Sequence, residues 1–231
     1  MTSQWGNIPD WAYEVSRSLM ASLGVVDPVT YQHCLRVGEM SRKLARDAGL
    51  NEYEQKVAEF AGLFHDIGKI GISQDIIAKP GRLEPKELDI MRNHPLLSEE
   101  IIRPLAKSSD FFEAMIPGIR GHHERVDGEG YPDKLLGDRV PLLARVILVV
   151  DTYDAMSQTR AYRKGLPDEV VYAELKRCAG TQFDAQLVRI FLEAHRTWKA
   201  QPTDVETQQR IVAPNAEEAA NVIPLPTKKV A

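Results

Sequence analysis

Apolar residues recur every three or four positions along most of the chain, which is the spacing of one helix face. The first helix should cover residues 8–24, with Pro9 in its first turn and Gly24 at its end. Further helices are predicted over residues 29–48, 51–68, 84–93, 95–102, 109–121, 142–157 and 184–199, and another one should begin at residue 167. Pro104 should end the helix that begins at Pro95. No alternating pattern is long enough to predict a strand, so we expect an all-α fold.

The helical spacing ends near residue 200. From Gln201 onward, four prolines are spread among small and polar residues, which is typical of a mobile tail. A short bound helix over residues 217–220 is the alternative. We therefore divide the chain into an N-terminal helix (1–26), one catalytic domain (27–200) and a C-terminal tail (201–231).

The composition is that of an ordinary soluble protein of 231 residues, with 43% hydrophobic and 27% charged residues. No apolar run is long enough to span a bilayer, and residues 1–10 do not resemble a secretory signal. Cys34 and Cys178 are too few for a disulfide framework and should be free buried thiols, so we expect a cytoplasmic protein. A net charge of −4 argues against DNA as a partner.

Five of the six histidines lie at predicted helix ends or on inward helix faces. Two aspartates join them, and 28 residues separate Asp66 from His94, His94 from His122, and His123 from Asp151. A lone buried histidine is usually a hydrogen-bonded core residue, but so many buried polar groups together need a common partner. Imidazole and carboxylate suit iron, manganese or zinc, and a carboxylate can bridge two ions. The pattern therefore predicts at least two metals, a site suited to phosphoester hydrolysis.

Cationic side chains near these groups could bind phosphate. Lys69 follows Asp66 by one helical turn and could reach a phosphate or a leaving oxygen, although a solvated lysine at a helix end is the alternative. Arg160 and Arg163 lie nine and twelve residues after Asp151 and could bind a second phosphate through their planar guanidinium groups, unless they belong to a solvated basic loop.

Six short motifs in this order resemble the HD-GYP domain of bacterial phosphodiesterases. They are His65-Asp66-Ile67-Gly68-Lys69, Lys79-Pro80-Gly81, His94-Pro95, His122-His123-Glu124, Asp127-Gly128-Glu129-Gly130-Tyr131-Pro132 and Asp151-Thr152-Tyr153-Asp154-Ala155. The resemblance covers roughly residues 27–193. A single HD pair is common to many phosphohydrolases, whereas the ordered set is highly specific.

The resemblance implies an all-helical HD domain with a binuclear metal site, and hydrolysis of cyclic di-GMP to pGpG or GMP. It implies that Asp66 bridges two divalent ions, most often iron or manganese, and that Lys69, Arg160 and Arg163 contact substrate phosphates. It implies seven metal ligands: His33, His65, Asp66, His94, His122, His123 and Asp151. The Gly130-Tyr131-Pro132 loop resembles the segment linked to the rim of the active site, with Tyr131 near the substrate, and to partner proteins.

Two positions depart from the family pattern. Val29 stands where some members carry a glutamate that is associated with a third metal, so we expect two metals. Ser98 replaces a usual glycine and could crowd a helix contact. Two alternatives to the hydrolase remain open: a catalytically silent cyclic-dinucleotide receptor, and an HD phosphohydrolase acting on another nucleotide.

Overall fold

The computed structural model describes residues 8–9, 11–159 and 164–198 of the chain. Its elements in order are α1 (Ala12–Val26), α2 (Pro28–Asp47), α3 (Glu52–Phe64), η1 (Ile67–Gly71), α4 (Gln74–Ile77), α5 (Pro85–Arg92), α6 (His94–Ala106), α7 (Asp110–Gly121), η2 (Gly137–Arg139), α8 (Leu142–Ser157), α9 (Asp168–Arg177) and α10 (Ala185–Trp198). The described residues form no strand, only two isolated bridges, one between Asp127 and Leu136 and one between Ala179 and Phe183. The all-α prediction is confirmed.

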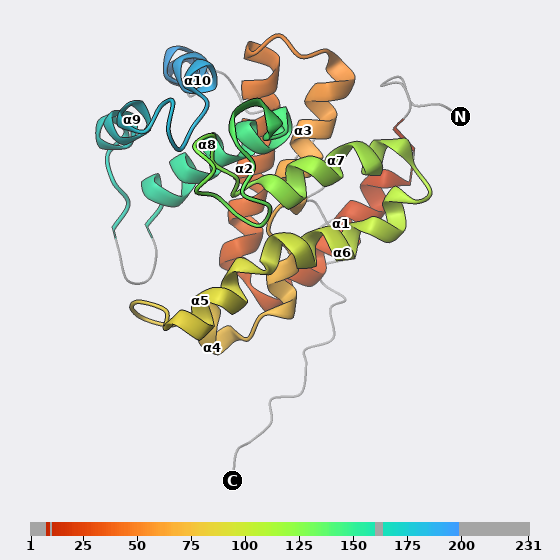
Figure 1. The fold of residues 1–231 in the computed structure, drawn as a ribbon. Helices are drawn as coiled ribbons and strands as arrows, with labels where there is room; N and C mark the ends of the chain where they lie inside the picture. Colours follow the sequence, from red (N-terminus) through yellow and green to blue (C-terminus); the bar gives the residue numbers. More distant parts are fainter. Residues whose placement is uncertain (1–7, 10, 160–163, 199–231) are drawn as a thin grey trace.

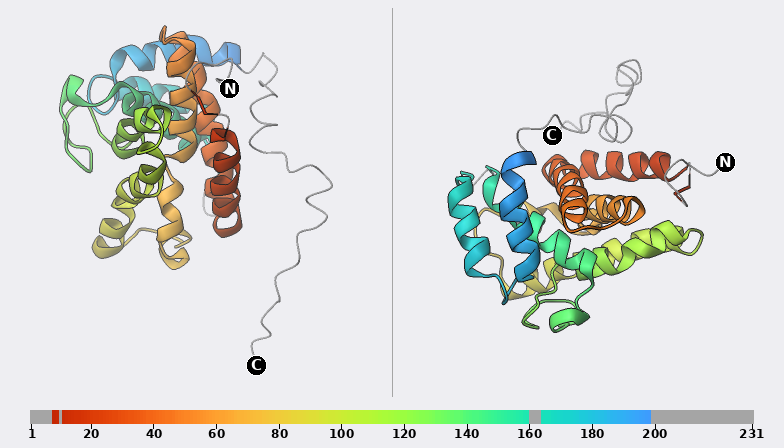
Figure 2. Two further views of the ribbon diagram at one scale, coloured as in Figure 1. Left: turned by 90° about the vertical axis from the view of Figure 1, so that its right-hand side faces the viewer. Right: turned by 90° about the horizontal axis from the view of Figure 1, so that it is seen from above.

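Helices α2 and α3 lie side by side at the centre, and the other helices surround them (Figure 1). The pair α6 and α7 covers one side, while α8, α9 and α10 cover another (Figures 1 and 2). Helix α1 packs against α2 and adds Met20 and Leu23 to the apolar core. The division at residue 26 therefore stays a prediction.

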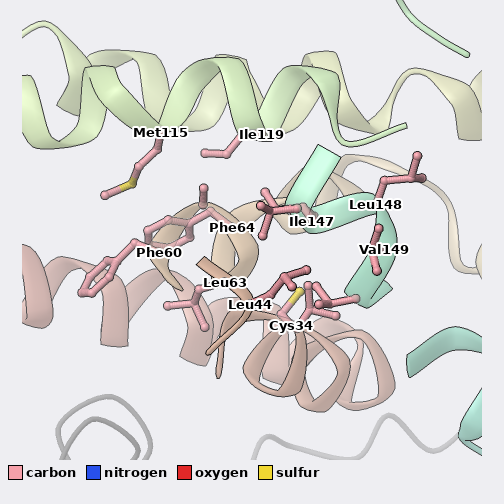
Figure 3. Close-up of a cluster of buried hydrophobic side chains, with 14 of the residues drawn as sticks. Cys34, Leu44, Phe60, Leu63, Phe64, Met115, Ile119, Ile147, Leu148 and Val149 are labelled. Atoms are coloured by element: carbon pink, nitrogen blue, oxygen red, sulfur yellow. The ribbon is translucent and has the colours of Figure 1, made fainter. Parts of the chain in front are cut away.

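The core lies where α3, α7 and α8 meet above α2. Figure 3 shows Phe60 and Phe64 of α3 below Met115 and Ile119 of α7, with Ile147 of α8 beside them. All five side chains are fully buried. Helix α8 is apolar around most of its circumference, with Val146 to Val150 all buried, which is expected of a helix inside a core.

Two predicted helix ends, at Gly24 and before Pro104, come too early. Helix α1 continues past Gly24 to Val26, because the actual stop is Asp27. The Asp27 carboxylate accepts hydrogen bonds from the backbone N–H groups of Val29 and Thr30 and so caps α2. Helix α6 continues through Pro104 to Ala106, since a proline in the last turn removes only one of the closing hydrogen bonds.

The HD pair does not lie in a helix, as the prediction of a helix reaching Gly68 required. Helix α3 ends at Phe64, and the 3-10 helix η1 begins at Ile67. His65 and Asp66 therefore occupy the turn between these two elements. A turn can aim two consecutive side chains into one space, whereas neighbours in a helix point about 100° apart.

Two predictions from composition can be compared with the described residues. Cys34 and Cys178 are both free and buried, as expected. Across residues 8–9, 11–159 and 164–198, no helix has both the length and the apolarity that a bilayer span requires. The predicted tail and the possible helix at 217–220 lie outside the described residues.

Candidate metal centre

Five elements direct histidine or aspartate side chains to one place in the interior. The contributors are His33 from α2, His65 and Asp66 from the turn after α3, His94 from the start of α6, His122 and His123 from the end of α7, and Asp151 from α8. His33, His65, Asp66, His94 and His122 are buried, and His123 and Asp151 are partly buried. All seven candidate ligands predicted from the sequence are thus brought together.

The seven side chains form two groups that share Asp66. In one group, potential ligand atoms of His33, His65 and Asp66 lie within 4.8 Å of one another. In the other, those of His94, His122 and His123 do so. Each group has the separation of atoms that could hold one metal ion.

The two carboxylate oxygens of Asp66 face different groups. Oδ2 lies 3.6 Å from His33 Nε2 and 3.4 Å from His65 Nε2. Oδ1 lies 3.1 Å from His94 Nε2 in the second group. Asp151 adds an oxygen to the first group, with Oδ1 at 3.1 Å from His33 Nε2. A carboxylate between two sets of imidazoles is suited to bridging two cations.

Hydrogen bonds on the outer ring nitrogens orient four of the imidazoles. Three of them donate from Nδ1 to the carbonyl three residues earlier: His65 to Gly62, His94 to Met91 and His122 to Ile119, each at 2.7 Å. His33 donates from Nδ1 to Asp154 Oδ2, also at 2.7 Å. In His65, His94 and His122, the proton on Nδ1 leaves the lone pair of Nε2 free to bind a metal. In His33, Nε2 lies 3.1 Å from Asp151 Oδ1 and must lose its proton before it can bind one.

The arrangement leaves inner atoms without protein partners. His65 Nε2 and Asp66 Oδ1 are buried and make no hydrogen bond. His94 Nε2 and His122 Nε2 approach to 3.0 Å although both rings carry their proton on the opposite nitrogen. Buried acceptors that face one another are unfavourable unless a cation lies between them. The residues therefore fit a pair of metal ions.

Burial keeps most of these imidazoles neutral. It lowers the pKa of His65, lowers that of His122 well below its usual value, and lowers the pKa of His123 to about 3. His33 differs: burial alone would lower its pKa, but hydrogen bonds to Asp151 and Asp154 raise it to about 9. Neutral imidazole is the form that binds metals.

The carboxylates of the site stay ionised. Burial alone would raise the pKa of Asp66, but Lys69 and His65 hold it well below its usual value. Burial would likewise raise the pKa of Asp151, but a hydrogen bond from His33 lowers it. Lys69 Nζ lies 2.5 Å from Asp66 Oδ2, so the structure brings this predicted phosphate-binding cation into the site.

The sequence reasoning missed the role of Asp154, which lies behind His33. Its carboxylate accepts the His33 hydrogen bond and also two from Arg36, at 2.6 and 2.8 Å. An acid one helical turn after Asp151, in a mostly apolar helix, was the available signal. Asp154 fixes the tautomer of His33 and the direction of its ring.

Ser98 and Gly68 join η1 to α6. The Ser98 hydroxyl donates to the carbonyl of His65 at 2.7 Å and accepts from the Gly68 N–H at 2.8 Å. The expected crowding by Ser98 is therefore wrong, because its side chain satisfies backbone groups of the HD turn. A Cβ at Gly68 would lie 2.3 Å from the His94 carbonyl oxygen, so only glycine permits this approach.

Glu124 holds the loop that follows the two histidines. Its carboxylate is fully buried and accepts hydrogen bonds from the backbone N–H groups of Asp133, Lys134 and Leu135. Glu124 is thus a loop anchor beside the ligand groups, a role that its place in the motif did not reveal. Tyr131 in this loop stacks on His123, with ring centroids 4.7 Å apart. The predicted rim position of Tyr131 agrees with this contact.

Arg160 and Arg163, the two remaining predicted phosphate-binding residues, lie outside the described residues.

A family model described as "HD domain" matches residues 17–187 of the chain. The ordered motifs, and curated relatives that are at least 33% identical, agree with this match. The chain belongs to the HD domain family, and within it to the HD-GYP group.

Curated relatives are 33–34% identical to this HD-GYP chain over their matched parts. A cyclic di-GMP phosphodiesterase of Thermotoga maritima is 33% identical over 81% of this chain and 50% of its own length. A cyclic di-GMP phosphodiesterase response regulator of Xanthomonas campestris is 34% identical over 68% of this chain and 41% of its own. A 3'3'-cGAMP-specific phosphodiesterase of Vibrio cholerae is 34% identical over 71% and 31%. The chain thus spans half or less of the length of these relatives.

Solved structures share the fold at lower identity. A cyclic GMP-AMP-specific phosphodiesterase of V. cholerae matches with a TM-score of 0.57 and 21% identity, over 89% of this chain and 54% of that one. An HDG"Y"P protein of Bdellovibrio bacteriovorus matches with a TM-score of 0.58 and 17% identity, over 81% and 62%.

Proposed function

We propose that this HD-GYP domain is a metal-dependent phosphodiesterase that hydrolyses cyclic di-GMP to pGpG or GMP. The observation that carries the proposal is the pair of ligand groups joined by Asp66. The names of relatives that are 33% and 34% identical support the reaction and the substrate. A cytoplasmic location, as expected from the two free thiols, is part of the proposal.

Two divalent ions, iron or manganese, would be held by the seven side chains, with Asp66 shared between them. His33, His65 and Asp151 would serve one ion, and His94, His122 and His123 the other. Such ions supply positive charge to phosphoryl oxygens and acidify water at neutral pH. Val29, at the position associated with a third metal, has an aliphatic side chain that is 66% exposed, which supports a count of two.

Lys69 and the loop residues would act on the substrate. The Lys69 side chain is 21% exposed, so its ammonium group could leave Asp66 and pair with a phosphate oxygen or with the leaving oxygen of the substrate. Arg160 and Arg163 would bind the second phosphate, and Tyr131 would line the rim. A regulatory protein could dock on the Gly130-Tyr131-Pro132 loop, whose Tyr131 and Pro132 remain partly exposed.

The test is anaerobic purification with ferrous iron or manganese, metal analysis, and incubation with cyclic di-GMP. We expect about two metals per chain and release of pGpG or GMP. Tight binding of cyclic di-GMP without turnover would favour the silent receptor. If the protein neither binds nor hydrolyses cyclic di-GMP, an HD phosphohydrolase acting on another nucleotide is favoured. Cyclic GMP-AMP belongs in the same assay, because relatives of similar identity are named for it.

A further inference from the structure

Arg92 is a cation at the rim of the metal centre that neither the motifs nor the proposed chemistry uses. It is the last residue of α5, its side chain is exposed, and it lies two residues before His94. The preceding residue, Met91, supplies the carbonyl that accepts the His94 Nδ1 hydrogen bond. Arg92 therefore stands on the same backbone turn that orients a metal-facing imidazole, so its position is well defined.

The guanidinium of Arg92 lies over a ring that faces the site. Its Cζ is 5.8 Å from the centroid of the Tyr131 ring. Tyr131 in turn stacks on His123 with centroids 4.7 Å apart. Two successive ring contacts thus connect Arg92 to the second ligand group. A cation over an aromatic face is held in place while its N–H donors stay free.

Two other cations near the site, both among the described residues, are already paired with carboxylates. Lys69 contacts Asp66, and Arg36 makes two hydrogen bonds to Asp154. Within the described ranges, no carboxylate pairs with Arg92. Its five donors are therefore available to a ligand, and an arginine fork suits two adjacent acceptor atoms.

We propose that Arg92 is a substrate-binding residue for the non-reacting half of a cyclic dinucleotide. Its guanidinium would bind a pair of acceptors, either the oxygens of the second phosphodiester or the N7 and O6 atoms of a guanine. Tyr131 holds the guanidinium toward the site. This assignment rests on the proposed phosphodiesterase function.

The decisive variants are Arg92→Ala and Lys86→Ala in the metal-loaded full chain. Lys86 is an exposed cation on the same helix, so its variant has the same change in net charge. With cyclic di-GMP, Arg92→Ala should raise KM by about 10- to 100-fold, the range expected for a charged hydrogen-bond pair, and leave kcat within about threefold. Lys86→Ala should leave both unchanged. Arg92→Lys keeps the charge but lacks the planar guanidinium, so its KM should lie between those of the wild type and Arg92→Ala.

Two further measurements identify the acceptor and the role of Tyr131. If Arg92→Ala weakens the KM or the binding affinity more for cyclic di-GMP than for cyclic di-AMP, Arg92 contacts the guanine. If the variant weakens both ligands equally, Arg92 contacts the phosphate. Tyr131→Ala should raise KM as well, and the double variant should lose less than the product of the single losses, because the residues act together.

If the wild type hydrolyses cyclic di-GMP and Arg92→Ala has an unchanged KM, the assignment of Arg92 is overturned but the proposed function stands. A fall in kcat together with lost metal would also overturn it, because Arg92 would then only support His94. Wild-type protein that neither binds nor hydrolyses cyclic di-GMP would overturn the proposed function and this assignment with it.

Discussion

At the scale of single residues, the same hydrogen bond orients three of the histidines. His65, His94 and His122 each donate from Nδ1 to the carbonyl of the residue three positions earlier. Carbonyls at the end of a helix lack partners within the helix, so they are available for this purpose. The backbone itself thereby turns three Nε2 atoms inward.

His33 lies inside α2, where the carbonyls are already used, and takes the Asp154 carboxylate instead. We expect Asp154→Asn to lower metal affinity about 10- to 100-fold with little change in helical content, because the residue that orients a ligand is weakened. Competition with a fluorescent chelator would measure the affinity. Asp89→Asn, on the exposed face of α5, is the matched control. Equal affinities in the two variants would contradict the orienting role.

Asp66 is the residue on which both ligand groups depend. Asp66→Ala should remove most bound metal and at least about 100-fold of the activity, since the shared oxygens disappear from both groups. Far-UV circular dichroism should change little because the apolar core is separate. Elemental analysis of the purified variant gives the metal content. Full metal occupancy in Asp66→Ala would be incompatible with a bridging carboxylate.

At the scale of elements, the site depends on how closely η1 approaches α6. Ser98 joins the two through hydrogen bonds to His65 and Gly68, and the absence of a side chain at Gly68 makes the distance possible. On the other side, Glu124 holds the loop after α7 through three backbone N–H groups. Helices, and short turns held by hydrogen bonds to their neighbours, thus carry the ligand groups.

Gly68→Ala tests this close approach. Its Cβ would lie 2.3 Å from the His94 carbonyl oxygen and 2.4 Å from the Ser98 nitrogen, so backbone must move. We expect a loss of about 1–3 kcal/mol in the free energy of unfolding and reduced metal content. Gly71→Ala in the same 3-10 helix meets only a Leu97 methyl group at 3.4 Å and should stay within about 0.5 kcal/mol of wild type. Urea unfolding compares them, and similar losses in both variants would argue against the packing explanation.

At the scale of the molecule, the apolar core and the metal centre are distinct parts of one helical array. Phe60, Phe64 and Ile119 fill the region between α3 and α7 (Figure 3). The HD pair and the two consecutive histidines directly follow the ends of these two helices. The core can therefore keep the helices together when the polar centre changes. Loss of metal should destabilise the protein without unfolding it.

Chelation tests this separation. If metal is present at about 100 times its Kd, each ion adds about 2.7 kcal/mol, so the removal of both ions should lower Tm by about 10–20 °C. Calorimetry before and after chelation, followed by restoration with manganese, would measure the shift. Asp66→Ala should lack it. A wild-type chain that loses its helical signal on chelation at room temperature would show that the metals, and not the core, hold the fold.

The amino-acid sequence alone was enough to predict the helical class, the order of the longer helices and the residue types of the centre. It did not predict the short helices η1 and α4. Periodicity reveals which faces are apolar, and imidazoles and carboxylates at helix ends and on buried faces indicate metal chemistry. The stops at Gly24 and Pro104 were wrong because both residues fit near the end of a helix when the next capping group lies further on.

The division of the seven side chains into two groups around Asp66, and the residues that support them, became visible only in the three-dimensional structure. The partners Asp154 and Ser98 lie 121 and 33 residues from the groups they bind. Arg92 at the end of α5 contacts Tyr131, which lies 39 residues later in the loop after α7. Local spacing constrains neighbours within a few turns, whereas contacts between elements follow from how the helices pack in three dimensions.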